Sequence, residues 1–203
     1  MARRPKVVII GGGIGGLAAG LAFLRRGIEV EIHEQAARQS EIGAGLNLSP
    51  NALKALRALG VEDEAIAIGF QNDCQVIRSW RSGRIISRQE LAGDVSHRFG
   101  AAFITIHRAD LLDILSRALP KHAVRLGASC ASVEAGEGFA AARFSDGHAI
   151  EADVVIGADG IHSVVRESLF GRDLPRFTGC VCWRGLVPIE ALADHPDARE
   201  MAA

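Results

Sequence analysis

The sequence has little of several residue types, and each shortage excludes a class of function. Tyrosine is absent from all 203 residues, so no tyrosine of this chain can act as a catalytic acid or base. The formal net charge is only −1, which gives no electrostatic basis for binding nucleic acid or an acidic membrane surface. The cysteines are scattered, at Cys74, Cys130, Cys180 and Cys182. They offer neither a disulfide framework nor metal-ligand spacing, so we expect reduced thiols, no metal and a cytoplasmic protein.

The sequence also has no convincing membrane span. The stretch Val7–Leu24 carries no charge, but six of its 18 residues are glycine and it is slightly short of a typical span. It runs directly into a predicted strand without a cleavage segment, unlike a signal peptide. Hydrophobic residues nevertheless make up 48% of the chain, enough for a substantial core.

What the sequence does have is a glycine motif between a strand and a helix. The β-branched run Val7–Ile10 is typical of a strand buried on both faces. Gly11, Gly13 and Gly16 then form G-x-G-x-x-G, which allows a tight turn, a close approach to pyrophosphate and close helix packing. Apolar residues at helical spacing follow, and Gly27 is expected to end that helix.

An acidic residue completes the pattern of a dinucleotide site. A second strand is predicted over Glu29–His33, and Glu34 follows it about 20 residues beyond the glycines, where a carboxylate accepts hydrogen bonds from a ribose. The start of a helix presents free N–H groups and a positive dipole end to phosphates. These features predict FAD or NAD binding rather than NADP. A glycine-rich packing turn is the alternative interpretation.

The remaining pattern alternates between strands and helices. Helices are predicted from Ser49 and Pro50 to Gly60, over 108–119 and after Gly160. Residues 91–100 are expected to form a loop. Strands are predicted over 74–81, 84–88, 102–106, 124–126, 130–135, 140–144, 148–151, 154–156 and 178–187. The pair over 74–88 does not alternate with helices, so we expect it in a different sheet from Val7–Ile10.

A second motif, GADG, follows the apolar strand Val154–Ile156. It places Asp159 at the carboxyl end of a buried strand, where open α/β sheets bind their ligands. A helix-capping role for Asp159 is the alternative.

Taken together, these motifs resemble those of the FAD-dependent aromatic-ring hydroxylases, the single-component flavin monooxygenases that include salicylate hydroxylase and 6-hydroxynicotinate monooxygenase. The resemblance covers essentially the whole chain. It depends on GGGIGG with Glu34, GAGLNLSPNALKAL at 43–56, ITIHRADLLDIL at 104–115 and VVIGADGIHSVVRESLFG at 154–171.

The resemblance implies an α/β fold. A Rossmann-like, doubly wound FAD-binding domain over 1–70 and 104–175 would be interrupted by an incomplete, β-rich substrate domain over 71–103 and 176–203. The family's later Gly-Asp motif is absent, so we expect a piece of a longer enzyme; a truncated gene product is the alternative.

The resemblance also implies the cofactor-binding residues. Asn47 stands where 6-hydroxynicotinate enzymes have histidine, so this chain lacks that candidate base. No residue is assigned a catalytic role. The expected cofactor-binding residues are Gly11, Gly13, Gly15, Gly16, Glu34, Gln35, Asn47, Arg108, Asp159 and Gly160.

The activity implied is hydroxylation of a small aromatic molecule, acidic or phenolic. NADH or NADPH would reduce FAD, and O2 would form a flavin hydroperoxide that delivers the OH group to the ring. Two alternatives stay open: a flavin epoxidase or hydroxylase of a non-aromatic substrate, and a truncated, non-catalytic FAD-binding protein.

Overall fold

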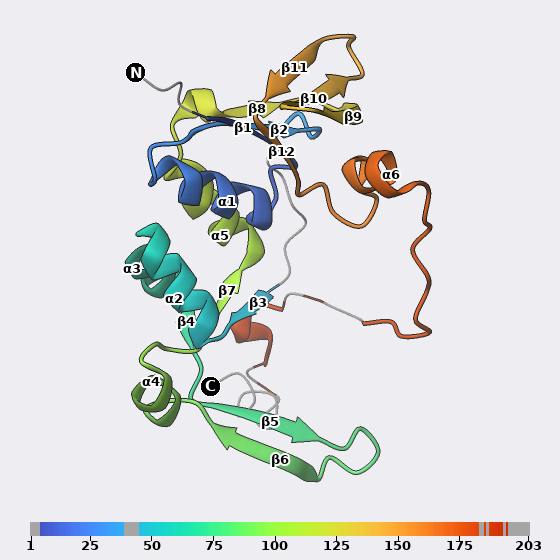
Figure 1. The fold of residues 1–203 in the computed structure, drawn as a ribbon. Helices are drawn as coiled ribbons and strands as arrows, with labels where there is room; N and C mark the ends of the chain where they lie inside the picture. Colours follow the sequence, from blue (N-terminus) through green and yellow to red (C-terminus); the bar gives the residue numbers. More distant parts are fainter. Residues whose placement is uncertain (1–4, 39–44, 183–184, 186, 193, 195–203) are drawn as a thin grey trace. The chain divides into compact units, whose positions relative to one another are not determined.

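The computed structural model describes residues 5–38, 45–182, 185, 187–192 and 194 (Figure 1). The chain divides into two compact units. Unit 1 comprises residues 1–41 and 111–180, and unit 2 comprises residues 42–110 and 181–203. These units do not test the predicted division into an FAD-binding domain and a substrate domain, so that division stays a prediction.

Unit 1 is built on a parallel sheet of four strands in the order β12-β1-β2-β8. The central strand β1 is buried along Val7–Ile10, which confirms the prediction from its apolar run. The bounds are Lys6–Ile10 for β1, Glu29–Glu34 for β2, Val124–Leu126 for β8 and Val154–Gly157 for β12.

An antiparallel sheet covers one face of β1. Its order is β11-β10-β9, with bounds Cys130–Gly136 for β9, Phe139–Phe144 for β10 and Ala149–Ala152 for β11. Val8 and Ile10 of β1 form one core cluster with Phe144 of β10 and Val165 of helix α6, which spans Val164–Phe170. Side chains alternate along a strand, so Val7 and Ile9 face the opposite side.

Three helical segments complete unit 1. Helix α1, Ile14–Leu24, packs on β1 and β2, and Figure 1 shows α1 and the antiparallel sheet on opposite sides of the parallel sheet. Gly27 ends α1 at φ +71°, with its N–H bonded to the Leu24 carbonyl and the Ile28 N–H bonded to the Phe23 carbonyl. This is the Schellman pattern expected of a C-terminal glycine. The others are α5, Arg108–Arg117, whose first three residues belong to unit 2, and the 3₁₀ turn η1, Lys121–Ala123.

Unit 2 contains two small antiparallel sheets. One has the order β3-β7-β4, and the other is the hairpin β5-β6, which confirms that residues 74–88 belong to a sheet other than that of β1. The bounds are Gly45–Leu48 for β3, Phe70–Gln71 for β4, Cys74–Arg78 for β5, Ile85–Glu90 for β6 and Ile104–His107 for β7.

The helices of unit 2 differ in part from the prediction. Helix α2, Pro50–Leu59, begins at the expected proline and ends at Gly60, which adopts φ +71°. Residues 91–100 hold a short helix, α4, Asp94–Phe99, so the predicted loop is wrong there. The prediction also omits α3, Glu62–Ile68, and the turn η2, Ile189–Leu192. Of the predicted strand over 178–187, residues 183, 184 and 186 lie outside the described part, and the described remainder forms no strand.

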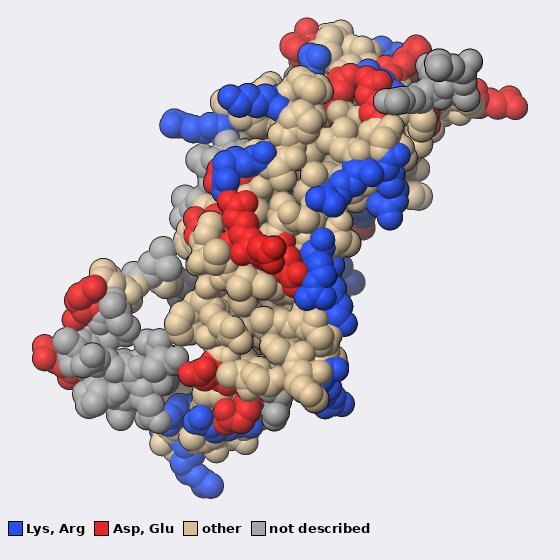
Figure 2. Space-filling model, turned by 90° about the vertical axis from the view of Figure 1, so that its left-hand side faces the viewer, with Lys and Arg blue, Asp and Glu red and all other residues tan. Residues whose placement is uncertain are grey.

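Within the part of the chain that the structure describes, no helix is long and apolar enough to cross a bilayer. Figure 2 shows lysine and arginine side chains interspersed with aspartate and glutamate side chains on the same face.

Candidate dinucleotide site

The glycine motif and GADG lie side by side at the carboxyl ends of β1 and β12. The chain leaves β1 toward β2 on one side, while β12 pairs on the other side, so this point is where the strand order reverses. The Gly11 N–H donates to the His33 carbonyl at 2.8 Å, and the Ala158 N–H donates to the Ile10 carbonyl at 2.7 Å. Ligands of open α/β sheets bind at such a reversal.

Gly11 and Gly16 are required by the protein's own packing. Gly11 has φ +108°, and a Cβ there would lie 2.3 Å from the Ala158 carbonyl oxygen. A Cβ on Gly16 would lie 1.9 Å from the Gly11 carbonyl oxygen. Both glycines therefore hold the turn, the helix and the GADG loop in contact.

Gly13 and Gly15 have no such internal reason. Neither has a positive φ, and apart from the chain neighbours and the backbone of helix α1, no described atom lies within 4 Å of a Cβ built at either position. Among the described residues, no side chain caps the start of α1, and its first turn holds no acidic residue. The open positions and uncapped N–H groups form a bare cradle at a helix start, which fits an anionic group such as a pyrophosphate.

Glu34 closes the same loop from β2. Its Oε2 accepts a hydrogen bond from the Gly12 N–H at 2.6 Å, and its Oε1 accepts one from the Ala36 N–H at 2.9 Å. An ionised carboxylate has about four acceptor positions, so Glu34 can still accept bonds from a ribose. Gln35 follows it and is exposed.

Asp159 caps helix α6. Its Oδ2 accepts from the Val165 N–H at 3.1 Å, and its Oδ1 accepts from the Ser163 hydroxyl at 2.6 Å. The Ser163 oxygen in turn accepts from the Arg166 N–H at 3.0 Å. The capping interpretation of Asp159 is therefore present in the structure, whereas a contact to the cofactor stays a prediction. Gly160 follows at φ +77°.

Cys130 lies near this carboxylate. Burial, and secondarily the negative charge of Asp159, raises the pKa of the Cys130 thiol above its ordinary value. The thiol therefore stays protonated at neutral pH, as an unreactive packing residue.

A buried histidine beside Glu34 was not recognised in the sequence as a special residue. The His33 ring is fully buried, and its centroid lies 4.6 Å from that of Phe144, which stacks at 4.3 Å on His148. No described residue gives its nitrogens a well-formed hydrogen bond, although Nε2 lies 3.5 Å from Glu31 Oε2. Burial lowers the pKa of His33 despite that carboxylate, so the ring is neutral at neutral pH.

Glu31 is the charged centre of this corner. It lies 2.7 Å from the Lys6 ammonium and 3.8 Å from Arg125 Nε. Partial burial raises the pKa of Glu31, but Lys6, Arg125 and His33 together outweigh burial and leave the pKa below its ordinary value. The alternating sequence of β2 does not indicate that a histidine is buried beside the Glu31–Lys6 ion pair.

The two remaining predicted residues belong to unit 2. Asn47, on β3, is exposed, and its Oδ1 accepts a hydrogen bond from the Thr105 hydroxyl at 2.9 Å. Arg108 is partly buried and begins helix α5. The structure thus brings the glycine motif together with Glu34 and Asp159 in unit 1, while Asn47 and Arg108 lie in the other unit.

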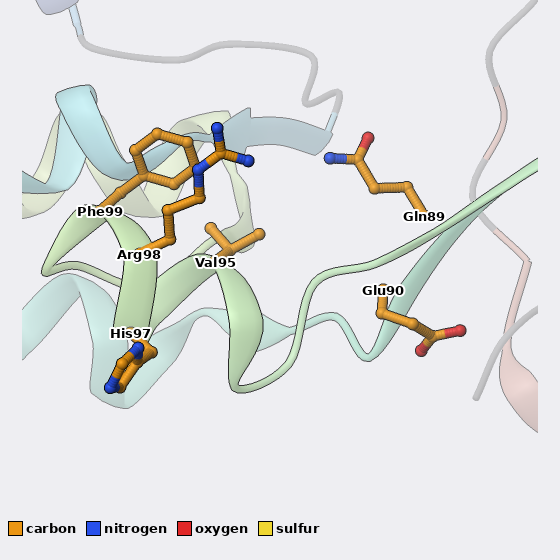
Figure 3. A pocket seen from close by; sticks show the side chains of 6 residues that line it. All are labelled: Gln89, Glu90, Val95, His97, Arg98 and Phe99. Atoms are coloured by element: carbon orange, nitrogen blue, oxygen red, sulfur yellow. The ribbon is translucent and has the colours of Figure 1, made fainter.

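A pocket of about 460 Å³ in unit 2 contains none of the predicted residues. Figure 3 shows Gln89 of β6 pointing toward α4, from which Val95, Arg98 and Phe99 extend. The Arg98 guanidinium lies 5.1 Å from the centroid of the neighbouring Phe99 ring. Glu90 and His97 complete the lining.

Comparison with known proteins identifies related sequences over almost the whole chain. A family model described as FAD binding domain matches residues 4–200. The chain is 40% identical over 195 residues to 3-amino-4-hydroxybenzoate 2-monooxygenase of Streptomyces cremeus, covering 96% of this chain and 49% of that protein. It is 36% identical over 188 residues to 6-hydroxynicotinate 3-monooxygenase of Bordetella bronchiseptica, covering 93% and 49%. The chain therefore spans about half the length of the curated relatives it matches.

Solved structures agree with these sequence relatives. Klebsiella pneumoniae HpxO complexed with FAD and uric acid superposes with a TM-score of 0.73 at 29% identity, covering 80% of this chain and 41% of that one. The 2,6-dihydroxypyridine-3-hydroxylase of Arthrobacter nicotinovorans gives 0.73 at 24% identity, covering 88% and 42%, which supports the fold. The predicted α/β Rossmann-like fold, the resemblance to FAD-dependent hydroxylases and the prediction of FAD as cofactor are confirmed. The chain belongs to the FAD binding domain family.

Proposed function

We propose that this chain is part of an FAD-dependent monooxygenase that uses NADH or NADPH and O2 to hydroxylate a small aromatic molecule, acidic or phenolic. The observation that carries the proposal is the bare cradle at the start of α1. The Cβ positions of Gly13 and Gly15 are open there, and no described side chain caps the helix. The relatives support the reaction type, because they are named monooxygenases of hydroxylated aromatic acids.

The residues of unit 1 are proposed to bind the adenosine diphosphate part of FAD. The N–H groups at the start of α1 bind the pyrophosphate beside Gly11, Gly13, Gly15 and Gly16. Glu34 accepts bonds from the adenosine ribose while it holds the Gly12 N–H, and exposed Gln35 lies next to it. Asp159 and Gly160 adjoin the ribose and pyrophosphate from the GADG loop.

Of the residues of unit 2, Arg108 is proposed to contact the phosphate–ribitol side of the flavin part of FAD, and Asn47 to lie beside the flavin ring. FAD, when bound, supplies the redox and oxygen chemistry, so the protein's own residues need only bind, orient and exclude water. The neutral Asn47 amide does not titrate, so it cannot act as a general base in this role. The segments 1–70 and 104–175 would form the FAD-binding domain, 71–103 and 176–203 part of a substrate domain, and the protein would be cytoplasmic.

The first test is an absorption spectrum of the purified chain after incubation with FAD and desalting. A retained flavin band is expected, and Gly13→Val should reduce it because a branched side chain fills the open cradle. Gly185→Val is the matched control, since Gly185 is exposed, has no positive φ and has open space at its Cβ position. Flavin retention that is equal in both variants would contradict the proposed cradle.

The activity itself is tested in the complete protein as its gene encodes it. We expect NADH or NADPH oxidation that is stimulated by a ring substrate and coupled to a hydroxylated product. Stimulated oxidation with no hydroxylated product from any ring substrate would contradict the hydroxylase proposal and leave a non-hydroxylating flavoprotein.

A nitrogen heterocycle is a second candidate substrate class. It is favoured by the similarity to HpxO, whose structure was solved with uric acid, and to 6-hydroxynicotinate 3-monooxygenase. Titration of the FAD-loaded protein with uric acid, 6-hydroxynicotinate and 3-hydroxybenzoate separates the two classes, because the preferred ring perturbs the flavin spectrum at the lowest concentration.

A further inference from the structure

The β3-β7-β4 sheet of unit 2 has two faces of opposite character. Leu48, Ile104 and Ile106 are buried on one face. Residues paired directly across the strands share a face, and the register pairs Asn47 and Phe70 with Thr105, and Gly45 with His107. The second face therefore carries an amide, a hydroxyl, an imidazole and a phenyl ring beside a glycine.

Three polar side chains on this face form a directed hydrogen-bond chain. The Asn72 Nδ2 donates to the Thr105 hydroxyl oxygen at 2.8 Å, and the Thr105 hydroxyl donates to Asn47 Oδ1 at 2.9 Å. A second contact, from Thr105 to Asn72 Oδ1, is longer at 3.2 Å. A hydroxyl has a single proton, so the shorter geometry assigns that proton to Asn47.

This chain fixes which end of the Asn47 amide is available. Its oxygen is turned to Thr105, and no described residue accepts a hydrogen bond from its nitrogen. Thr105 and Asn72 are partly buried, whereas Asn47 is exposed, so the chain runs from the interior to the surface. The exposed end is then an NH₂ group, which can only donate.

We propose that Thr105 and Asn72 are positioning residues that hold Asn47 as a hydrogen-bond donor toward an acceptor atom of the bound ring system. The inference rests on the proposed function, in which Asn47 lies beside the flavin ring, where a ring substrate would be hydroxylated. The acceptor is a carbonyl oxygen, a phenolate oxygen or an unprotonated ring nitrogen. Because an amide does not titrate, the donor is present at every working pH, unlike a histidine at the same position.

The first experiment measures the amide in the ligand-free chain by ¹⁵N–¹H NMR. We expect the Asn47 side-chain NH₂ signal to exchange quickly with water, and to shift in Thr105→Val because its acceptor end loses its donor. Thr178→Val is the matched control, since Thr178 is exposed outside this sheet. An Asn47 signal that is unchanged in Thr105→Val would overturn the assigned orientation.

The second experiment measures binding of 3-hydroxybenzoate and 6-hydroxynicotinate to the FAD-loaded complete protein by flavin absorbance. Asn47→Asp keeps the shape but replaces the NH₂ donor with an acceptor, so we expect affinity to fall more than in Asn47→Ala, by about tenfold relative to wild type. Thr105→Val should weaken binding less than Asn47→Asp does. This loss of affinity should be the same at every pH, because neither side chain titrates. Wild-type affinity in Asn47→Asp would overturn the donor role.

These outcomes separate the inference from the proposed function. If the wild-type protein binds FAD but neither ring probe nor any other aromatic acid, the hydroxylase proposal fails together with the ligand role of Asn47. The NMR experiment then still decides whether Thr105 orients the amide, because it needs neither FAD nor a ring ligand.

Discussion

Glycines of one motif can have different physical reasons, and Gly15 and Gly16 separate two of them. Gly15 lies in the first turn of α1 with open space at its Cβ position, whereas a Cβ at Gly16 meets the Gly11 carbonyl oxygen. We expect Gly15→Ala to leave the free energy of unfolding unchanged or raise it by up to about 1 kcal/mol, because alanine favours a helix. The same change should weaken FAD binding about tenfold, since the methyl group meets the pyrophosphate.

Gly16→Ala serves as the comparison. It should lower the free energy of unfolding by about 1–3 kcal/mol through overpacking. Chemical denaturation and FAD titration of both variants check the pair. Equal losses of stability would show that both glycines serve internal packing and would remove the argument for the cradle.

The burial of His33 leads to a prediction of how the free energy of unfolding depends on pH. Burial places its pKa in the folded chain below the ordinary 6.5, so the folded state binds fewer protons than the unfolded state. The contribution of His33 to the free energy of unfolding is therefore fully present above pH 6.5. It decreases as the pH is lowered below 6.5. His33→Phe keeps a ring against Phe144 without the titration, so its unfolding free energy should depend less on pH between about 5 and 7.

The charged groups around His33 determine how the test is controlled. Glu31, Arg125 and His148 act electrostatically on the ring, Lys6 pairs with Glu31, and all four are unchanged in the variant. His122→Gln, at an exposed histidine in η1, is the control and should leave the pH profile as in the wild type. A His33→Phe profile as steep as the wild-type profile would contradict the assignment to His33.

The structural roles that the sequence predicted correctly are those whose reason is local. Gly11 turns with a positive φ, Gly27 and Gly60 end helices, and Glu34 is the last residue of β2. His33 and the Asn72–Thr105–Asn47 chain were missed because their partners are distant in sequence and meet only when strands pair. Local patterns contain no information about such pairings.

Helix α6 shows how one residue serves an element and a candidate site together. Asp159 accepts from the Val165 N–H and from the Ser163 hydroxyl, so both side chains support the helix start. We expect Ser163→Ala to lower the free energy of unfolding by about 1 kcal/mol, the usual loss for a helix cap. It should leave FAD affinity nearly unchanged, because Asp159 keeps its bond to Val165.

Asp159→Ala should lower stability to a similar extent or more. Only this variant should also weaken FAD binding, since it removes the carboxylate proposed to adjoin the ribose. Thermal unfolding without FAD and FAD titration provide the two readings. If both variants lose stability and neither loses FAD affinity, Asp159 acts as a cap alone.

The elements that the sequence reasoning missed are short and depend on tertiary contacts. Helix α3 has Glu62, Asp63 and Glu64 in its first turn, a signal that was available, and Glu62 forms an ion pair with Arg57 of α2. Helix α4 is six residues long and follows Gly93 at its N-cap, without a side-chain cap among the described residues. Strand β3 reads as a glycine-rich loop until it pairs with β7. By contrast, long apolar or regularly spaced segments such as β1 and α5 were predicted at nearly their observed bounds.

At the scale of the whole molecule, the predicted FAD contacts are divided between the two units. The glycine motif, Glu34 and Asp159 belong to unit 1, and Asn47 and Arg108 belong to unit 2. If each group binds the part of FAD proposed for it, ADP should report on unit 1 alone, because ADP has the adenosine and pyrophosphate but no flavin.

We therefore expect Arg108→Ala to weaken FAD binding about tenfold while leaving ADP affinity within about twofold of wild type. Gly15→Ala should weaken both ligands, because both have the pyrophosphate. Arg117→Ala, on the same helix α5 and paired with Asp113 at 2.8 Å, is the control for a lost surface arginine and should change neither affinity. Isothermal titration of the wild type and of each variant with FAD and with ADP gives the affinities to be compared. Equal weakening of ADP and FAD in Arg108→Ala would place Arg108 with the phosphates, and the assignment of the flavin part to unit 2 would then depend on Asn47 alone.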